Sequence, residues 1–117
     1  MSGITAHVLD TALGLPAAGL TIRLAVLEGG ADSGDGRFRT LAEAQTNADG
    51  RVANLLMGTV SEGTYKITFF TGAYFARCGQ PTFFPTVEVQ FILGDAHQHY
   101  HIPLLLSPFG YSTYRGS

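Results

Sequence analysis

Apolar and polar residues alternate along most of this chain, and this period-two pattern is the feature that most restricts its fold. The segment 20–26 reads Leu-Thr-Ile-Arg-Leu-Ala-Val, and the segments 65–69 and 87–93 follow the same pattern. Such alternation is typical of strands that have one buried and one exposed face. The same reasoning predicts further strands, at 4–10, 39–46, 52–55 and 99–106.

Turn-forming residues separate these segments. The sequence Asn47-Ala48-Asp49-Gly50 predicts a tight turn, because Asn and Asp side chains bond their own backbone and Gly supplies positive φ. Gly14-Leu15-Pro16 is a second turn signal, 29–36 is a Gly, Asp and Ser-rich loop, and one short helix is expected at 72–78. Seven or eight short strands indicate an all-β sandwich, and the 117 residues suffice for a single domain, 1–117.

The composition is low in charge. Only 14% of the residues are charged and 45% are hydrophobic, whereas ordinary domains carry about 25% charged residues. So few charges leave apolar surface uncovered, which favours burial between subunits. The net charge of -2 provides no basic field for nucleic acid. No Lys/Arg-rich amphipathic stretch and no apolar run of roughly 20 residues points to a membrane.

Cys78 is the single cysteine, which excludes an internal disulfide and a cysteine-based zinc site. The first ten residues lack the basic and apolar regions of a secretory signal. The last three residues are not the Ser-Lys-Leu peroxisomal signal. We therefore expect a cytoplasmic location by default.

Three histidines alternate near the end of the chain. His99 and His101 fall on one face of a predicted strand, and Tyr100 and Ile102 fall on the other. Two adjacent imidazoles could form an acid/base pair or, with His97, a metal site. They could equally be ordinary histidines on a polar sheet face. The spacing leaves all three interpretations open.

Two other residues are weaker candidates. His7 lies in the first predicted strand on the face opposite Val8, and Arg51 directly follows the turn at 47–50. Each could be an ordinary surface or strand residue, although a planar guanidinium is well shaped to hold an anionic or carbonyl-rich ligand. No nucleophile elbow, phosphate loop or dinucleotide motif competes with them. The residues alone indicate a β-sandwich with a histidine-bearing face.

Four ordered blocks of the sequence belong together: HVLD at 7–10 with GLPA at 14–17, TNADGR at 46–51, TFFP at 82–85, and HYHIPLLLSP at 99–108 with YRGS at 114–117. In these blocks the chain resembles the 5-hydroxyisourate hydrolases, a transthyretin-related family. The resemblance implies a transthyretin-like β-sandwich of two four-stranded sheets with one short helix. It also implies a homotetramer, built as a dimer of dimers, with active sites in a channel between the dimers.

The implied activity is the hydrolysis of 5-hydroxyisourate to 2-oxo-4-hydroxy-4-carboxy-5-ureidoimidazoline in urate breakdown, with no metal or other cofactor. His7 and His101 match the positions expected to activate water and transfer protons, in an undecided division of roles. Arg51 would orient the ring and stabilise negative charge. The hydroxyl or terminal carboxylate of Ser117 would complete the catalytic pocket. Substrate binding or enclosure is implied for a further set: His99, Tyr114, Arg115 and Gly116.

Three alternatives differ in class from this hydrolase. One is a transthyretin-type carrier of an aromatic hormone or metabolite, although a carrier needs no pair of histidines with an arginine. Another is a structural or adhesive sandwich that assembles through edge strands. The third is a metal-dependent enzyme that uses His97, His99 and His101.

Overall fold

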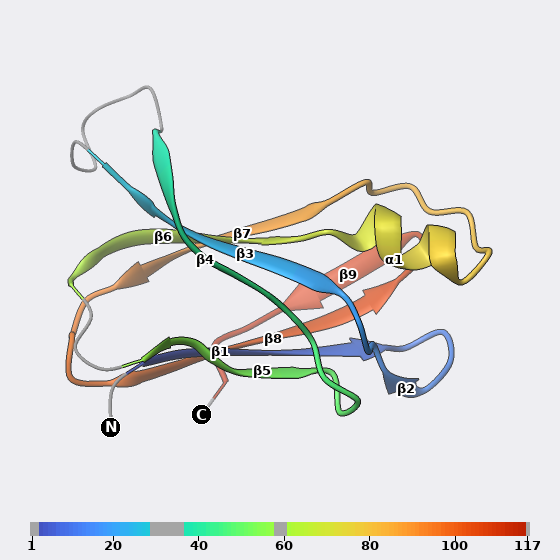
Figure 1. Ribbon diagram of the computed structural model, residues 1–117, viewed down its shortest axis with the longest axis horizontal. Coiled ribbons are helices and arrows are strands. Elements are labelled where there is room, and N and C mark those ends of the chain that lie inside the picture. Colours follow the sequence, from blue (N-terminus) through green and yellow to red (C-terminus); the bar gives the residue numbers. More distant parts are fainter. Residues whose placement is uncertain (1–2, 29–36, 58–60, 117) are drawn as a thin grey trace.

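The computed structural model describes residues 3–28, 37–57 and 61–116, which form two β-sheets packed face to face (Figure 1). One sheet has four strands in the order β4-β3-β6-β7, and every neighbouring pair in it is antiparallel. Its strands are β3 (Thr21–Leu27), β4 (Phe38–Gln45), β6 (Gly63–Phe69) and β7 (Val87–Leu93).

The other sheet is also four strands wide, although it contains five strands. β8 occupies one edge of β1 along its whole length, and β9 pairs with the far edge of β8. The two-residue β2 and the longer β5 therefore share the remaining edge of β1. The bounds are β1 (Gly3–Asp10), β2 (Leu15–Pro16), β5 (Arg51–Met57), β8 (His99–Ser107) and β9 (Gly110–Thr113).

The alternation of apolar residues places the core between the two sheets, as predicted. In β1 the side chains of Ile4, Ala6 and Val8 are fully buried, whereas the residues between them are partly exposed. The same inward face continues across the neighbouring strands. The core of this sheet also includes Val52, Leu55, Tyr100, Ile102, Leu104 and Leu106.

A short helix, α1 (Thr71–Arg77), lies at one end of the sandwich between β6 and β7 in sequence (Figure 1). The side chains of Tyr74 and Phe75, on the inner face of this helix, are buried. The Tyr74 hydroxyl donates to Oδ2 of Asp10 at 2.8 Å, and the other oxygen of that buried carboxylate accepts backbone N–H groups of the following turn. The helix is thereby tied to the end of β1. No helix in the described ranges is long and apolar enough to cross a membrane.

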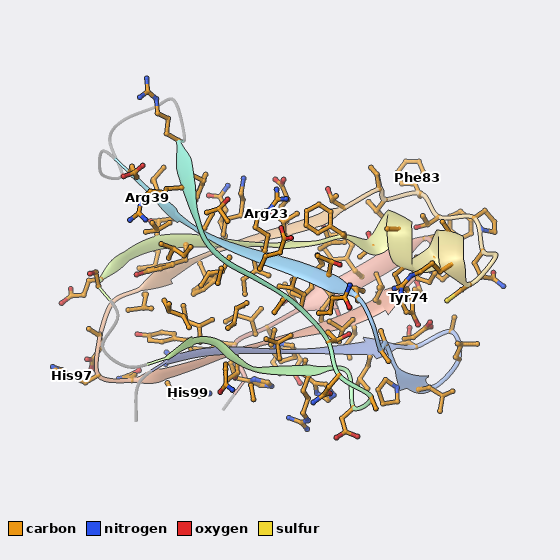
Figure 2. The ribbon with its side chains drawn as sticks, viewed as in Figure 1. Arg23, Arg39, Tyr74, Phe83, His97 and His99 are labelled. Carbon is orange, nitrogen blue, oxygen red and sulfur yellow. The ribbon has the colours of Figure 1, made fainter. Side chains whose placement is uncertain are left out.

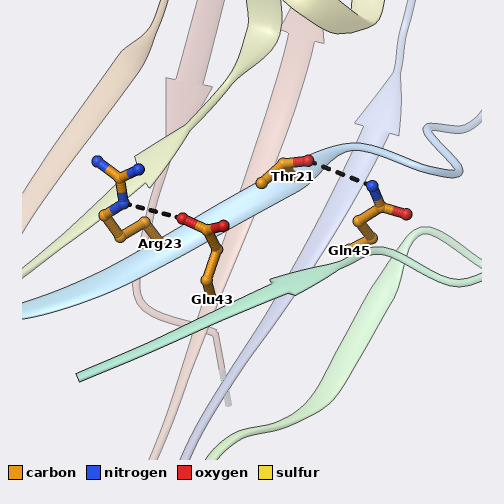
Figure 3. A network of polar contacts seen from close by, with 4 residues as sticks. All are labelled: Thr21, Arg23, Glu43 and Gln45. Atoms are coloured by element: carbon orange, nitrogen blue, oxygen red, sulfur yellow. Dashed lines mark hydrogen bonds and ion pairs between the residues drawn. The ribbon is translucent and has the colours of Figure 1, made fainter. Parts of the chain in front are cut away.

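Polar pairs cover the outer surface of the first sheet. Across β3 and β4, Arg23 Nε lies 3.0 Å from Glu43 Oε2, and Gln45 Nε2 donates to Thr21 Oγ1 at 3.5 Å (Figure 3). Both pairs join residues that are direct neighbours in the strand register. Because the ion pair is exposed, we attribute at most about 1 kcal/mol of stability to it.

Candidate active site

The candidate site lies on the outer face of the sheet that contains β1, β5 and β8. β1 and β8 are parallel, and Thr5 is the direct partner of His101 in their register. On the other edge of β1, His7 is the direct partner of Arg51 in β5. Figure 2 shows His99 on this outer face, away from the second sheet. Two strand pairings thus bring together residues that lie about 50 and 100 positions apart in the sequence.

A single hydroxyl connects the two histidines of β8. Thr5 Oγ1 lies 2.7 Å from Nδ1 of His101 and 3.0 Å from Nε2 of His99. Both distances are within hydrogen-bonding range. The prediction that His99 and His101 share a face is therefore confirmed, with Thr5 between their rings.

His7 stands next to this group. Its ring centroid is 6.3 Å from that of His101, and the two ring planes are tilted by 31°. The backbone of Asp49, in the turn that precedes β5, is near enough to the His7 ring to affect its pKa. That turn is closed by the Asn47 side chain, whose Oδ1 accepts the N–H groups of Asp49 and Arg51. The turn therefore positions both the backbone of Asp49 beside His7 and the start of β5.

Both central histidines favour the uncharged form. Burial lowers the pKa of His7, and the nearby positive charge of Arg51 lowers it further, against a smaller opposing effect from Asp49. Burial also lowers the pKa of His101 most strongly, and electrostatic interactions with Arg51, His7 and His99 lower it further. At neutral pH the site therefore presents two neutral imidazoles, each able to accept or donate a proton, beside a permanent guanidinium charge.

Arg51, His99 and His101 line a surface hollow of about 260 Å³, and His7 stands next to His101. Neutral imidazoles can activate water and transfer protons, and a guanidinium can stabilise negative charge that develops on an oxygen. The arrangement is suited to adding water to a carbonyl carbon. The residues that line the hollow are Thr5, Ala6, Arg51, Val52, Ala53, His99 and His101.

The end of the chain reaches the site through its backbone. Gly116 N donates to the carbonyl oxygen of His101 at 2.8 Å, in an isolated antiparallel bridge. A Cβ at residue 116 would lie 2.6 Å from Cδ2 of the His101 ring, so this position requires glycine. Ser117 lies outside the described residues.

The two residues before this bridge point elsewhere. Arg115 donates to Oε1 of Gln98 at 2.7 Å, and its guanidinium carbon lies 4.5 Å from the centre of the Tyr100 ring. Arg115 and Tyr114 line a different hollow of about 340 Å³, beside β7. A single copy of the chain therefore does not bring these two side chains to the histidines, and their contact with substrate stays a prediction.

His97 lies apart from the site, in the exposed turn before β8 (Figure 2). Its backbone N–H donates to Oδ1 of Asp95. Within the described ranges, no three His, Cys, Asp or Glu side chains are grouped in a way that could hold a metal ion. Cys78 is exposed at the end of α1 and takes no part in the site.

Thr5 and Asp49 are the contributors that sequence reasoning missed. Strand alternation places Thr5 on the same face as His7, which was the available signal, but a lone threonine has no distinctive motif. Asp49 acts through its backbone, and a backbone contact has no signature in the side-chain sequence.

Comparison with known proteins places this geometry in context. The HIUase/Transthyretin family matches residues 4–116. The chain is 49% identical to 5-hydroxyisourate hydrolase 2 of Rhizobium meliloti, over 97% of this chain and 95% of that protein. It matches the structure of Klebsiella pneumoniae 5-hydroxyisourate hydrolase with a TM-score of 0.83 and 40% identity, covering 99% and 100% of the two chains. Sea bream transthyretin in complex with thyroxine matches with a TM-score of 0.87 and 30% identity, covering 97% and 93%.

Proposed function

Because the chain belongs to the HIUase/Transthyretin family, we propose that it is a hydrolase that opens the ring of 5-hydroxyisourate at a carbonyl–nitrogen bond. The observation that carries the proposal is that His101 and Arg51 line one hollow, with the ring of His7 next to that of His101. The relatives named above as 5-hydroxyisourate hydrolases support the choice of substrate.

The proposed reaction begins with water attacking the ring carbonyl. One of the neutral imidazoles of His7 and His101 removes a proton from the water as its oxygen bonds to carbon. The oxyanion that develops is stabilised by Arg51, whose guanidinium remains charged throughout. When the carbon–nitrogen bond breaks, a proton reaches the leaving nitrogen, and the histidine pair returns to its starting state. Every step uses groups of this chain and water.

We propose that the tail completes the pocket. Gly116 already donates its N–H to the carbonyl oxygen of His101, which fixes the backbone of the tail beside this histidine. The hydroxyl of Ser117 is the group proposed to complete the pocket. Tyr114 and Arg115 would bind or enclose the substrate in an assembly in which a second chain brings them close to a histidine hollow.

We also propose that the chain forms a homotetramer, arranged as a dimer of dimers. Ile92 in the edge strand β7 is 78% exposed, and Tyr114, which lines the same hollow as Ile92, is 58% exposed. Large apolar side chains next to an unpaired strand edge favour association with another chain. The outer-face position of the histidine hollow also suits a site that is closed by a neighbouring subunit.

The test is an absorbance assay with freshly generated 5-hydroxyisourate. The untagged chain is compared with a variant that lacks residues 114–117, and each is measured against the spontaneous decay of the substrate. We expect the full chain to accelerate substrate loss and the truncated chain to lose this acceleration. Circular dichroism of both proteins checks that the truncation leaves the sandwich folded.

The second candidate is a small-molecule carrier, and the match to a transthyretin with bound thyroxine favours it as the alternative. A carrier requires an apolar channel and no acid/base pair. If the full chain does not exceed the spontaneous decay rate, the hydrolase proposal fails. Binding of aromatic ligands to the unmodified chain then becomes the relevant measurement.

A further inference from the structure

Thr5 contacts two imidazoles with an oxygen that carries only one hydrogen. A threonine hydroxyl donates one hydrogen bond and accepts others, so it cannot donate to His99 and His101 at the same time. At least one histidine must therefore donate to Thr5, and the other either donates to the second lone pair of the oxygen or accepts from the hydroxyl. The direction of this chain of hydrogen bonds decides which nitrogen of His101 carries the proton.

The two distances indicate the direction. The contact from Thr5 Oγ1 to Nδ1 of His101 is 2.7 Å, whereas the contact to Nε2 of His99 is 3.0 Å. N–H donors usually lie about 2.9–3.0 Å from an acceptor oxygen, and hydroxyl donors approach oxygen more closely, so the shorter contact suits a hydroxyl donor. The pattern fits His99 Nε2–H donating to Thr5, and the Thr5 hydroxyl donating to Nδ1 of His101.

We propose that Thr5, supported by His99, is a positioning residue that holds neutral His101 in the tautomer with its proton on Nε2. Thr5 is well placed for this role because it is the direct register partner of His101. Its β-branched side chain also has few allowed rotamers, which restricts the position of the hydroxyl oxygen. His99 is the more exposed ring and acts only through Thr5 in this arrangement.

The consequence for the reaction rests on the proposed hydrolase function. Nε2–H makes His101 a hydrogen-bond donor to the substrate carbonyl oxygen, where negative charge develops. A neutral imidazole can polarise a carbonyl in this way without transferring its proton. Water activation then falls to His7, whose ring centroid is 6.3 Å from that of His101. The two histidines thereby receive different roles.

The first test reads the tautomer directly and needs no substrate. The full-length protein is labelled with ¹⁵N-histidine, and long-range ¹H–¹⁵N correlation spectra are recorded at neutral pH. We expect His101 to show a protonated Nε2 and an unprotonated Nδ1 that accepts a hydrogen bond. In Thr5→Val the bias is lost and both tautomers appear. A protonated Nδ1 in the unmodified protein overturns the proposal.

Kinetics provide the second test. Thr5→Val should lower kcat about tenfold, the size of one lost hydrogen bond, with KM changed by less than about twofold. Thr5→Ser keeps the hydroxyl and should restore most of the rate and the tautomer. An unchanged kcat in Thr5→Val overturns the positioning role. If the unmodified chain shows no hydrolysis, the proposed function fails, while the tautomer spectra still decide the role of Thr5.

Discussion

At the scale of single residues, the site depends on keeping two imidazoles uncharged beside a guanidinium. Burial and the charge of Arg51 both lower the pKa of His7 and of His101. We therefore predict that both histidines titrate below 6.5, the ordinary value, in ¹H NMR titrations. In Arg51→Gln both midpoints should rise, because a positive charge that lowers each pKa is removed. A midpoint above 6.5 in the unmodified protein would contradict the assigned environment.

The lowered pKa values of His7 and His101 also make the stability of the fold depend on pH. A histidine whose pKa is lower in the folded state binds protons more tightly when the chain unfolds. The two residues therefore lower the free energy of unfolding progressively as the pH falls below 6.5. Well above that pH they have no effect on it.

His101 is the residue whose replacement should be most costly for activity. We expect His101→Asn to lower turnover by at least about 100-fold, since acid/base groups and oxyanion donors each typically contribute that much. His97→Asn is the matched control, because His97 lies in an exposed turn away from the hollow. Steady-state rates with 5-hydroxyisourate measure both variants. Unchanged turnover in His101→Asn would remove His101 from the reaction.

At the scale of elements, the turn before β5 holds the site in place. Gly50 has a φ of +73°, and a Cβ there would press against the carbonyl oxygen of Val8. We predict that Gly50→Ala lowers the free energy of unfolding by about 2–4 kcal/mol, since it combines backbone strain with a clash. Gly14 has a similar φ of +72° but open space around it, so Gly14→Ala should cost only about 1 kcal/mol. Urea unfolding of both variants checks this difference, and equal losses would disprove the clash.

The elements also show what the sequence could and could not reveal. Strand positions and the inward and outward faces were predictable, because alternation depends on each residue and its immediate neighbours. The helix was expected at 72–78 and occurs at Thr71–Arg77. The short strand β9 was not expected, since its four residues follow a turn closely and show little alternation. The parallel pairing of β1 with β8 depends on the whole topology, which no local pattern encodes.

The same distinction applies to the site. His7, Arg51, His99 and His101 were predicted as candidates, and the strand register explains why they meet. The position of Arg115 could not be predicted, because its side chain follows the path of the tail across β8 to the Tyr100 ring. Residues whose direction depends on tertiary contacts are the ones that sequence patterns leave open.

At the scale of the whole molecule, low charge and exposed apolar edges point to assembly. We predict that the unmodified chain of 12.5 kDa elutes as a species of about 50 kDa, measured by light scattering coupled to size exclusion. Ile92→Glu places a charge on the exposed edge of β7 and should shift the protein toward smaller species, with loss of activity. Ala73→Glu, on the exposed face of α1, is the control and should leave the mass unchanged. A chain that is monomeric at micromolar concentration yet fully active would disprove the need for a neighbouring subunit.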